Sequence, residues 1–183
     1  MKRNNRGFTL VELVVALAIL GILSAAVIGF VSTGASAYRS VSASVNLQTE
    51  SQLCMNQIQQ YLIDCNGGVS FVDDSLYILN REDDGGWWVH AFQFRGGTLY
   101  YSKNSVTNDE GSYACTVADG DKLSGHVASF TADTGPAGTA AAVTLTIGFE
   151  NSGKTYSAAQ TTALRNSVCS AVSLETLLGE VCG

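Results

Sequence analysis

A run of 24 residues near the N-terminus, Phe8–Val31, contains one charged side chain, that of Glu12. At ~1.5 Å per residue, a helix of this length reaches about 36 Å, which exceeds the ~30 Å hydrocarbon core of a bilayer. Lys2, Arg3 and Arg6 precede the run, and the positive-inside rule keeps such an N-terminus in the cytoplasm. The sequence therefore predicts a single membrane crossing, with all later residues on the outer side.

The remainder of the chain is acidic. Removing the three leading basic residues from a total of ten leaves seven, against 16 acidic residues. A protein that binds nucleic acid through its phosphates needs a basic surface, so the composition argues against a nucleic-acid-binding site. The length of 183 residues suits one ordinary domain, or a small domain with an appendage.

Three interpretations of the N-terminal segment compete. It is a secretory signal peptide cleaved near Ser24-Ala25-Ala26, a plain membrane anchor, or a short basic leader cut just before an apolar run that stays on the mature protein. An ionised carboxylate inside a membrane-spanning segment costs at least ~2.5 kcal/mol and usually serves a function. Glu12 therefore favours the third interpretation, because a signal peptide or plain anchor has no use for it.

Cleavage between Gly7 and Phe8 would leave Glu12 four residues beyond a new α-amino group, a rise of ~6 Å in a helix. A neighbouring subunit, offset along a filament, can present its own amine to this carboxylate. The buried charge would then be compensated between subunits.

The segment Arg6-Gly7-Phe8-Thr9-Leu10-Val11-Glu12-Leu13, followed by the apolar run, resembles the N-terminus of type IV pilins and the related pseudopilins. The resemblance implies cleavage after Gly7 by a prepilin peptidase and N-methylation of the Phe8 amine. It also implies filament assembly through the helix, with Glu12 guiding docking.

One feature departs from the family pattern. Major pilins of this family often carry a proline about two-thirds along the apolar helix, whereas this chain has Gly21, Gly29 and Gly34 and its single proline at Pro136. Glycine costs ~1 kcal/mol of helix propensity without blocking a helix. Close packing through small residues and local melting between Gly21 and Gly34 are both open interpretations.

A continuation of the first helix is predicted to about Asp64, because no proline interrupts it and Asn66-Gly67-Gly68 provides a stop signal. Apolar residues recur at steps of three, four and seven and form one face: Leu47, Cys54, Ile58, Tyr61, Leu62 and Cys65. The helix is expected to pack this face on a globular domain.

Strand patterns follow the helix. They are expected at 76–80, 87–94, 98–103, 126–132, 142–149 and 154–163. Asn151-Ser152-Gly153 joins the last two as a hairpin turn, and a long polar stretch covers 104–125. The predicted fold is α+β, with a long N-terminal helix packed on an antiparallel sheet of about four to six strands. The expected organisation is a cleaved leader (1–7), a membrane or filament-core helix (8–31), its amphipathic continuation (32–65) and a β-rich domain (66–183), hereafter the head.

Five cysteines in an exported head suit an oxidising compartment. Cys54 and Cys65 are separated by about three helical turns, ~16 Å, so they cannot pair while the helix is intact. Each must bond elsewhere, to Cys115, Cys169 or Cys182; alternatively Cys169 pairs with Cys182 and the helix cysteines stay reduced. A metal site is not expected, since no Cys-x-x-Cys motif occurs and only two histidines are present.

No catalytic constellation is recognised. His90 and His126 fall within predicted strands, and none of the common nucleophile, phosphate-binding or zinc motifs occurs. The acidic clusters at 82–84 and 119–121 lack calcium-loop spacing and are interpreted as solvated turns. Trp87-Trp88 alternate across a strand, so one ring is expected in the core and the other at the surface.

The sequence is therefore interpreted as a structural, non-enzymatic filament subunit without cofactors. Its expected partners are membrane lipid, a prepilin peptidase, the assembly platform of the cytoplasmic membrane and other pilin subunits. It would be anchored in that membrane by a single pass and later form part of a cell-surface filament. The irregular head, the five cysteines and a strand ending in Leu164-Arg165-Asn166 favour a minor pilin. A pseudopilin of a type II secretion or DNA-uptake system, and a membrane-tethered surface protein that never polymerises, are the alternatives.

Overall fold

The computed structural model describes residues 9–83, 85–109 and 112–182. The chain divides into two compact units, Met1–Ser42 and Ala43–Gly183. A single helix, α1 (Leu10–Ile63), contributes to both units and continues without a break through its three glycines.

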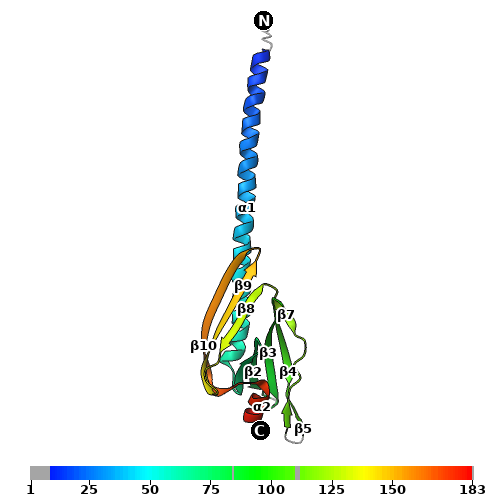
Figure 1. The fold of residues 1–183 in the computed structure, drawn as a ribbon, viewed down its shortest axis with the longest axis vertical. Coiled ribbons are helices and arrows are strands. Elements are labelled where there is room, and N and C mark those ends of the chain that lie inside the picture. Colours follow the sequence, from blue (N-terminus) through cyan, green and yellow to red (C-terminus); the bar gives the residue numbers. More distant parts are fainter. Residues whose placement is uncertain (1–8, 84, 110–111, 183) are drawn as a thin grey trace. The chain divides into compact units, whose positions relative to one another are not determined.

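The second unit contains all the strands and a short C-terminal helix (Figure 1). The elements after α1 are β1 (Gly68–Val72), β2 (Ser75–Arg81), β3 (Trp87–Arg95), β4 (Thr98–Ser105), β5 (Thr107–Asp109), β6 (Ser112–Ala114), β7 (Asp121–Ser124), β8 (Val127–Asp133), β9 (Gly138–Asn151), β10 (Lys154–Ala171) and α2 (Leu174–Cys182).

The main sheet has eight strands in the order β7-β4-β3-β2-β1-β10-β9-β8, and β5 pairs with β6 in a separate hairpin. All neighbouring strands are antiparallel except β1 and β10, which run parallel with Gly68 opposite Cys169. β9 and β10 form the long hairpin seen in Figure 1. Ser152 and Gly153 turn this hairpin with φ values of 51° and 72°, the left-handed conformation that a tight hairpin turn requires.

The two faces of the sheet are covered by different helices. The end of α1 packs on one face through Leu47, Ser51, Cys54, Met55, Ile58 and Leu62. Alternate strand residues therefore enter two cores: Ile78 and Phe92 lie in the α1 core, whereas Leu79 and Ala91 lie in the core under α2. The central side chains of both cores, such as Ile78 and Leu79, have no exposed surface.

The predicted α+β class is confirmed, with the long helix packed on a largely antiparallel sheet. The expected strand number is wrong, since the main sheet has eight strands and β5 and β6 lie within the supposed polar stretch. β1 and α2 were not expected, and the strand expected to close at Asn166 continues to Ala171. Cys65 lies two residues beyond the end of α1, so it is not helical.

Candidate functional site

The first turn of α1 is held by a side-chain cap. The Glu12 amide donates to Thr9 Oγ1 at 3.3 Å, and the Leu13 amide donates to the Thr9 carbonyl at 3.2 Å. Threonine followed three residues later by glutamate is the capping-box pattern, and it satisfies amides that a helix start leaves unpaired. The Glu12 carboxylate is exposed in this turn, where the positive end of the helix dipole favours an anion. Sequence reasoning missed the cap, although the T-x-x-E spacing shows it.

The described part of the first unit is a largely apolar helix with exposed side chains. Every residue from 9 to 39 is exposed, including Phe30 at 81%. This part of α1 is long and apolar enough to cross a membrane. The hydroxyls of Ser24 and Thr33 donate to the carbonyls of Leu20 and Gly29, at 2.8 and 3.0 Å. Such internal bonding satisfies polar side chains in an apolar environment.

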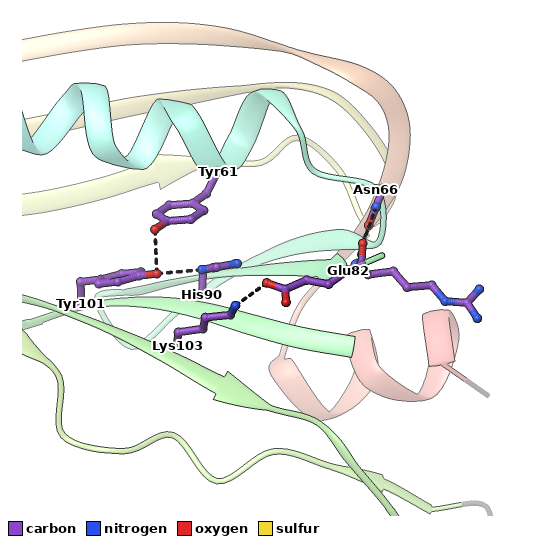
Figure 2. A network of polar contacts seen from close by, with 7 residues as sticks. Tyr61, Asn66, Glu82, His90, Tyr101 and Lys103 are labelled. Carbon is purple, nitrogen blue, oxygen red and sulfur yellow. Dashed lines mark hydrogen bonds and ion pairs between the residues drawn. The ribbon is translucent and has the colours of Figure 1, made fainter. Parts of the chain in front are cut away.

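A polar network connects α1 to the sheet inside the second unit. Figure 2 shows Tyr61 reaching from the helix towards Tyr101, whose hydroxyl also meets His90. The Tyr101 hydroxyl donates to the Tyr61 oxygen at 2.9 Å, and His90 Nδ1 lies 2.9 Å from the Tyr101 oxygen. Because the Tyr101 hydroxyl donates its proton to Tyr61, the Tyr101 oxygen acts as the acceptor for His90 Nδ1–H. The Tyr61 and His90 rings stack with centroids 4.1 Å apart.

Charged residues border this network. Lys103 forms an ion pair with Glu82, and its ammonium group also lies 4.4 Å from the Trp88 ring centre. A cavity of about 390 Å³ is lined by Lys103 and Glu82 together with Tyr61 and His90. The Asn66 side chain, which also lines the cavity, accepts from the Arg81 backbone amide at 2.7 Å and donates to the Arg81 carbonyl at 3.0 Å. The cavity is polar and mixed in charge, and its residues are largely bonded to one another.

Burial lowers the pKa of His90 to about 4 from its usual 6.5; the Lys103 charge also lowers it, and Glu82 opposes the shift. Between pH 6.5 and 4 the unfolded chain binds the His90 proton more strongly than the folded one. The free energy of unfolding is therefore unaffected by His90 above pH 6.5, and it falls by about 3 kcal/mol as the pH drops towards 4.

A His90→Gln variant should lose this part of the pH dependence of the free energy of unfolding. Urea unfolding followed by tryptophan fluorescence at several pH values would measure it, and parallel curves for variant and wild type would contradict the assignment.

The segment Leu164-Arg165-Asn166 anchors the end of α1. Arg165 forms an ion pair with Asp64 at 3.0 Å, and the Asn166 amide donates to the Cys65 carbonyl at 3.3 Å. The side chain of Asn166 therefore supplies a partner for a backbone carbonyl in the loop that follows α1. The register shift between Ala163 and Val168 in β10 brings these side chains out of the regular ladder.

The five cysteines are free thiols in the structure. Cys54 and Cys65 are buried in the α1 core, where burial raises their pKa values to about 11 and about 12. Cys115, Cys169 and Cys182 are half-buried around the core under α2. Whether disulfides form therefore stays a prediction.

Other sequence candidates are dispersed. His90 lies in β3, whereas His126 lies just before β8 and bonds Glu50 of α1 at 2.9 Å. Asp119 of the second acidic cluster pairs with Arg95 at 3.1 Å. Within 9–83, 85–109 and 112–182, no group of three His, Cys, Asp or Glu side chains gathers as a metal site would require. Of the two neighbouring tryptophans, Trp87 packs against the core under α2, as expected for one of them, whereas Trp88 is half-buried with the Lys103 ammonium group over its ring.

Gly7 and Phe8, the predicted cleavage and methylation residues, lie outside the described residues. They fall, with Glu12, inside a family match: residues 2–28 match the model described as the prokaryotic N-terminal methylation motif. Searches of curated proteins and of solved structures gave no match.

The N-terminal segment is that of a type IV pilin-like or pseudopilin precursor, a substrate of prepilin peptidase with a class III signal peptide. The apolar part of α1 suits a membrane-anchored precursor. The α+β architecture of the second unit, with α1 against an antiparallel-rich sheet, fits the pilin fold.

Proposed function

We propose that this protein is a structural subunit of a type IV pilus or a pilus-like filament, assembled through α1 as a minor pilin. The observation that carries the proposal is the exposed apolar surface of residues 9–39 with a lone carboxylate at Glu12, inside the methylation motif. An apolar helix of this kind needs lipid or other helices around it. Lipid covers it in the precursor, and the helices of other subunits cover it in the filament.

Glu12 has a specific part in this proposal. After cleavage at Gly7, the Phe8 amine of one subunit pairs with the Glu12 carboxylate of another, which sets the axial offset between them. The cap at Thr9 supports this role, because it satisfies the backbone at the helix start and leaves the carboxylate free of it.

We propose a structural role without enzymatic activity for the head. Its polar network is bonded internally and holds α1 to the sheet. The Leu164-Arg165-Asn166 segment, which resembles that of minor pilins, has a structural role in this proposal. Its Arg165 and Asn166 side chains bond the residues at the end of α1.

Processing is the most direct test. Mass spectrometry of the protein from expressing cells should find a mature chain that starts at Phe8 with one added methyl group on its amine. An intact Met1, or a mature chain that starts near Ala26, would contradict the proposal. Quantifying the protein in purified filaments tests the finer assignment: a minor pilin should be a small fraction of the subunits, and a dominant fraction would make it a major pilin.

A further inference from the structure

Three of the five cysteines surround the core under α2. The buried members of this core are Leu79, Val89, Ala91, Ala171, Leu177 and Leu178, and Cys115, Cys169 and Cys182 pack around it. They come from three different elements, since Cys115 follows β6, Cys169 belongs to β10 and Cys182 ends α2. Which of them can meet depends on the side of α2 on which each lies.

Cys169 lies on the side of α2 that faces β10. Its thiol donates to the Glu180 carboxylate at 2.9 Å. A side chain at Gly68 would meet both Leu177 and Cys169, at 2.5 Å and 3.1 Å, so these two are neighbours. Leu177 and Glu180 are three residues apart and share one side of the helix.

Cys115 lies on the opposite side of α2. Together with Leu174, Glu175, Leu178 and Gly179 of the helix, it lines a cavity of about 550 Å³. The order of the strands supports this placement of Cys169 and Cys115 on opposite sides of α2. β10 adjoins β1 on one side, whereas β2 and β3 follow on the other. The β5–β6 hairpin belongs to the β3 side, where the Val106 amide donates to the Trp87 carbonyl at 2.9 Å.

The position of Cys182 within α2 decides whether Cys115 or Cys169 can be its partner. It follows Leu178 by four residues and Gly179 by three, and side chains at these spacings share a helix face. It is only two residues from Glu180, and side chains two apart do not face the same way. We infer that Cys115 and Cys182 form a disulfide that joins the C-terminal helix to the β5–β6 hairpin, and that Cys54, Cys65 and Cys169 stay as thiols.

The reaction requires an oxidant of the disulfide class, such as an envelope dithiol oxidase. The thiolate of one cysteine attacks the oxidant's disulfide and forms a mixed disulfide, and the second thiolate then displaces the oxidant. Two protein thiols lose two protons and two electrons, and the oxidant's disulfide is reduced to two thiols.

The remaining cysteines are poorly suited to this exchange. Burial raises the pKa of Cys115, Cys169 and Cys182 alike, but at Cys169 the hydrogen bond to Glu180 and its negative charge raise the pKa further, to about 11, and the thiol proton is held by the carboxylate. Cys54 and Cys65 are 2% and 0% exposed, and the Cys65 thiol points at the carbonyls of Gly68 and Leu79. An oxidant has no access to them in the folded protein.

Peptide mapping tests the pairing directly. The full-length protein, exported in cells and alkylated before extraction, is digested with trypsin without reduction. Cys115 then lies in peptide 104–122, whereas Cys169 and Cys182 share peptide 166–183. The two peptides should be linked, and a second digestion after Glu175 and Glu180 should leave residues 181–183 on the link and release the part with alkylated Cys169.

Matched single substitutions complete the test. The link should survive in Cys169→Ser and disappear in Cys182→Ser. A link that instead depends on Cys169, a bridge within peptide 166–183, or full alkylation of Cys115 and Cys182 in the exported protein would overturn the inference. Because the wild-type digest identifies the bonded residues by itself, the result does not depend on the variants folding.

Discussion

Replacing Leu62 with alanine is expected to destabilise the fold by about 2–5 kcal/mol, the usual cost of a leucine-to-alanine change in a packed core. Leu62 is fully buried in the last turn of α1, in the core that includes Ile78 and Phe92. The alanine leaves a cavity that a sheet pinned on its other face by α2 cannot readily close. Urea unfolding of the unassembled protein in detergent, followed by the fluorescence of Trp87 and Trp88, would measure the loss.

The same helix offers a matched control. Leu53 is 66% exposed on α1, and its replacement by alanine should change the free energy of unfolding by less than about 0.5 kcal/mol. Both variants make the same chemical change in one helix of one unit, so helix propensity cancels between them. Equal losses in the two variants would mean that α1 does not pack on the sheet as described.

The sequence predicted the elements whose patterns are local. The apolar run and the stripe through Ile58 and Leu62 have helical spacing, and α1 ends at Ile63, near the expected stop. The Asn151-Ser152-Gly153 turn marked the hairpin correctly, because a tight turn needs residues that tolerate positive φ.

The missed elements depend on long-range pairing. β1 is a five-residue strand between β2 and β10, and its parallel partner lies about a hundred residues later in the sequence. The hydrophobic pattern of the residues near Gly68 does not indicate a partner strand so far along the sequence. α2 was missed because its nine residues make only two to three turns, too few for a clear periodicity. Its burial of Leu177 and Leu178 against the sheet is a tertiary effect.

The functional residues divide in the same way, into those with a local sequence signal and those that depend on long-range contacts. Glu12 could be singled out because one carboxylate in an apolar run is a local anomaly. The connection of Tyr61, His90 and Tyr101 could not be predicted, because it joins a helix to two strands, and in the sequence Tyr61 appeared only as part of an apolar stripe. The cysteine spacing likewise left the pairing open, and only the side of α2 that each residue occupies distinguishes Cys115 from Cys169 as the partner of Cys182.

The proposed assembly role makes the largest functional prediction. A Glu12→Ala variant should insert into the membrane and be cleaved as the wild type is, yet be incorporated poorly into filaments. Removing the carboxylate leaves the Phe8 amine of a neighbouring subunit without its partner in an apolar environment. At a cost of at least ~2.5 kcal/mol, incorporation should fall by roughly 70-fold. Immunoblots of sheared filaments and of membranes would compare the two pools.

The helix cap makes this variant a clean test of the charge. Thr9 Oγ1 accepts from the backbone amide of residue 12, so the cap persists when the side chain is alanine, and a loss of assembly cannot be attributed to unwinding of the first turn. Glu12→Gln, which keeps the size but not the charge, should be equally defective. Ser24→Ala is the matched control in the same apolar segment, because its hydroxyl only bonds the Leu20 carbonyl of its own helix, and it should assemble normally. Normal filament incorporation of Glu12→Ala would show that the carboxylate does not guide docking, whereas loss of its membrane insertion would indicate an earlier defect in the precursor and also contradict the assigned role.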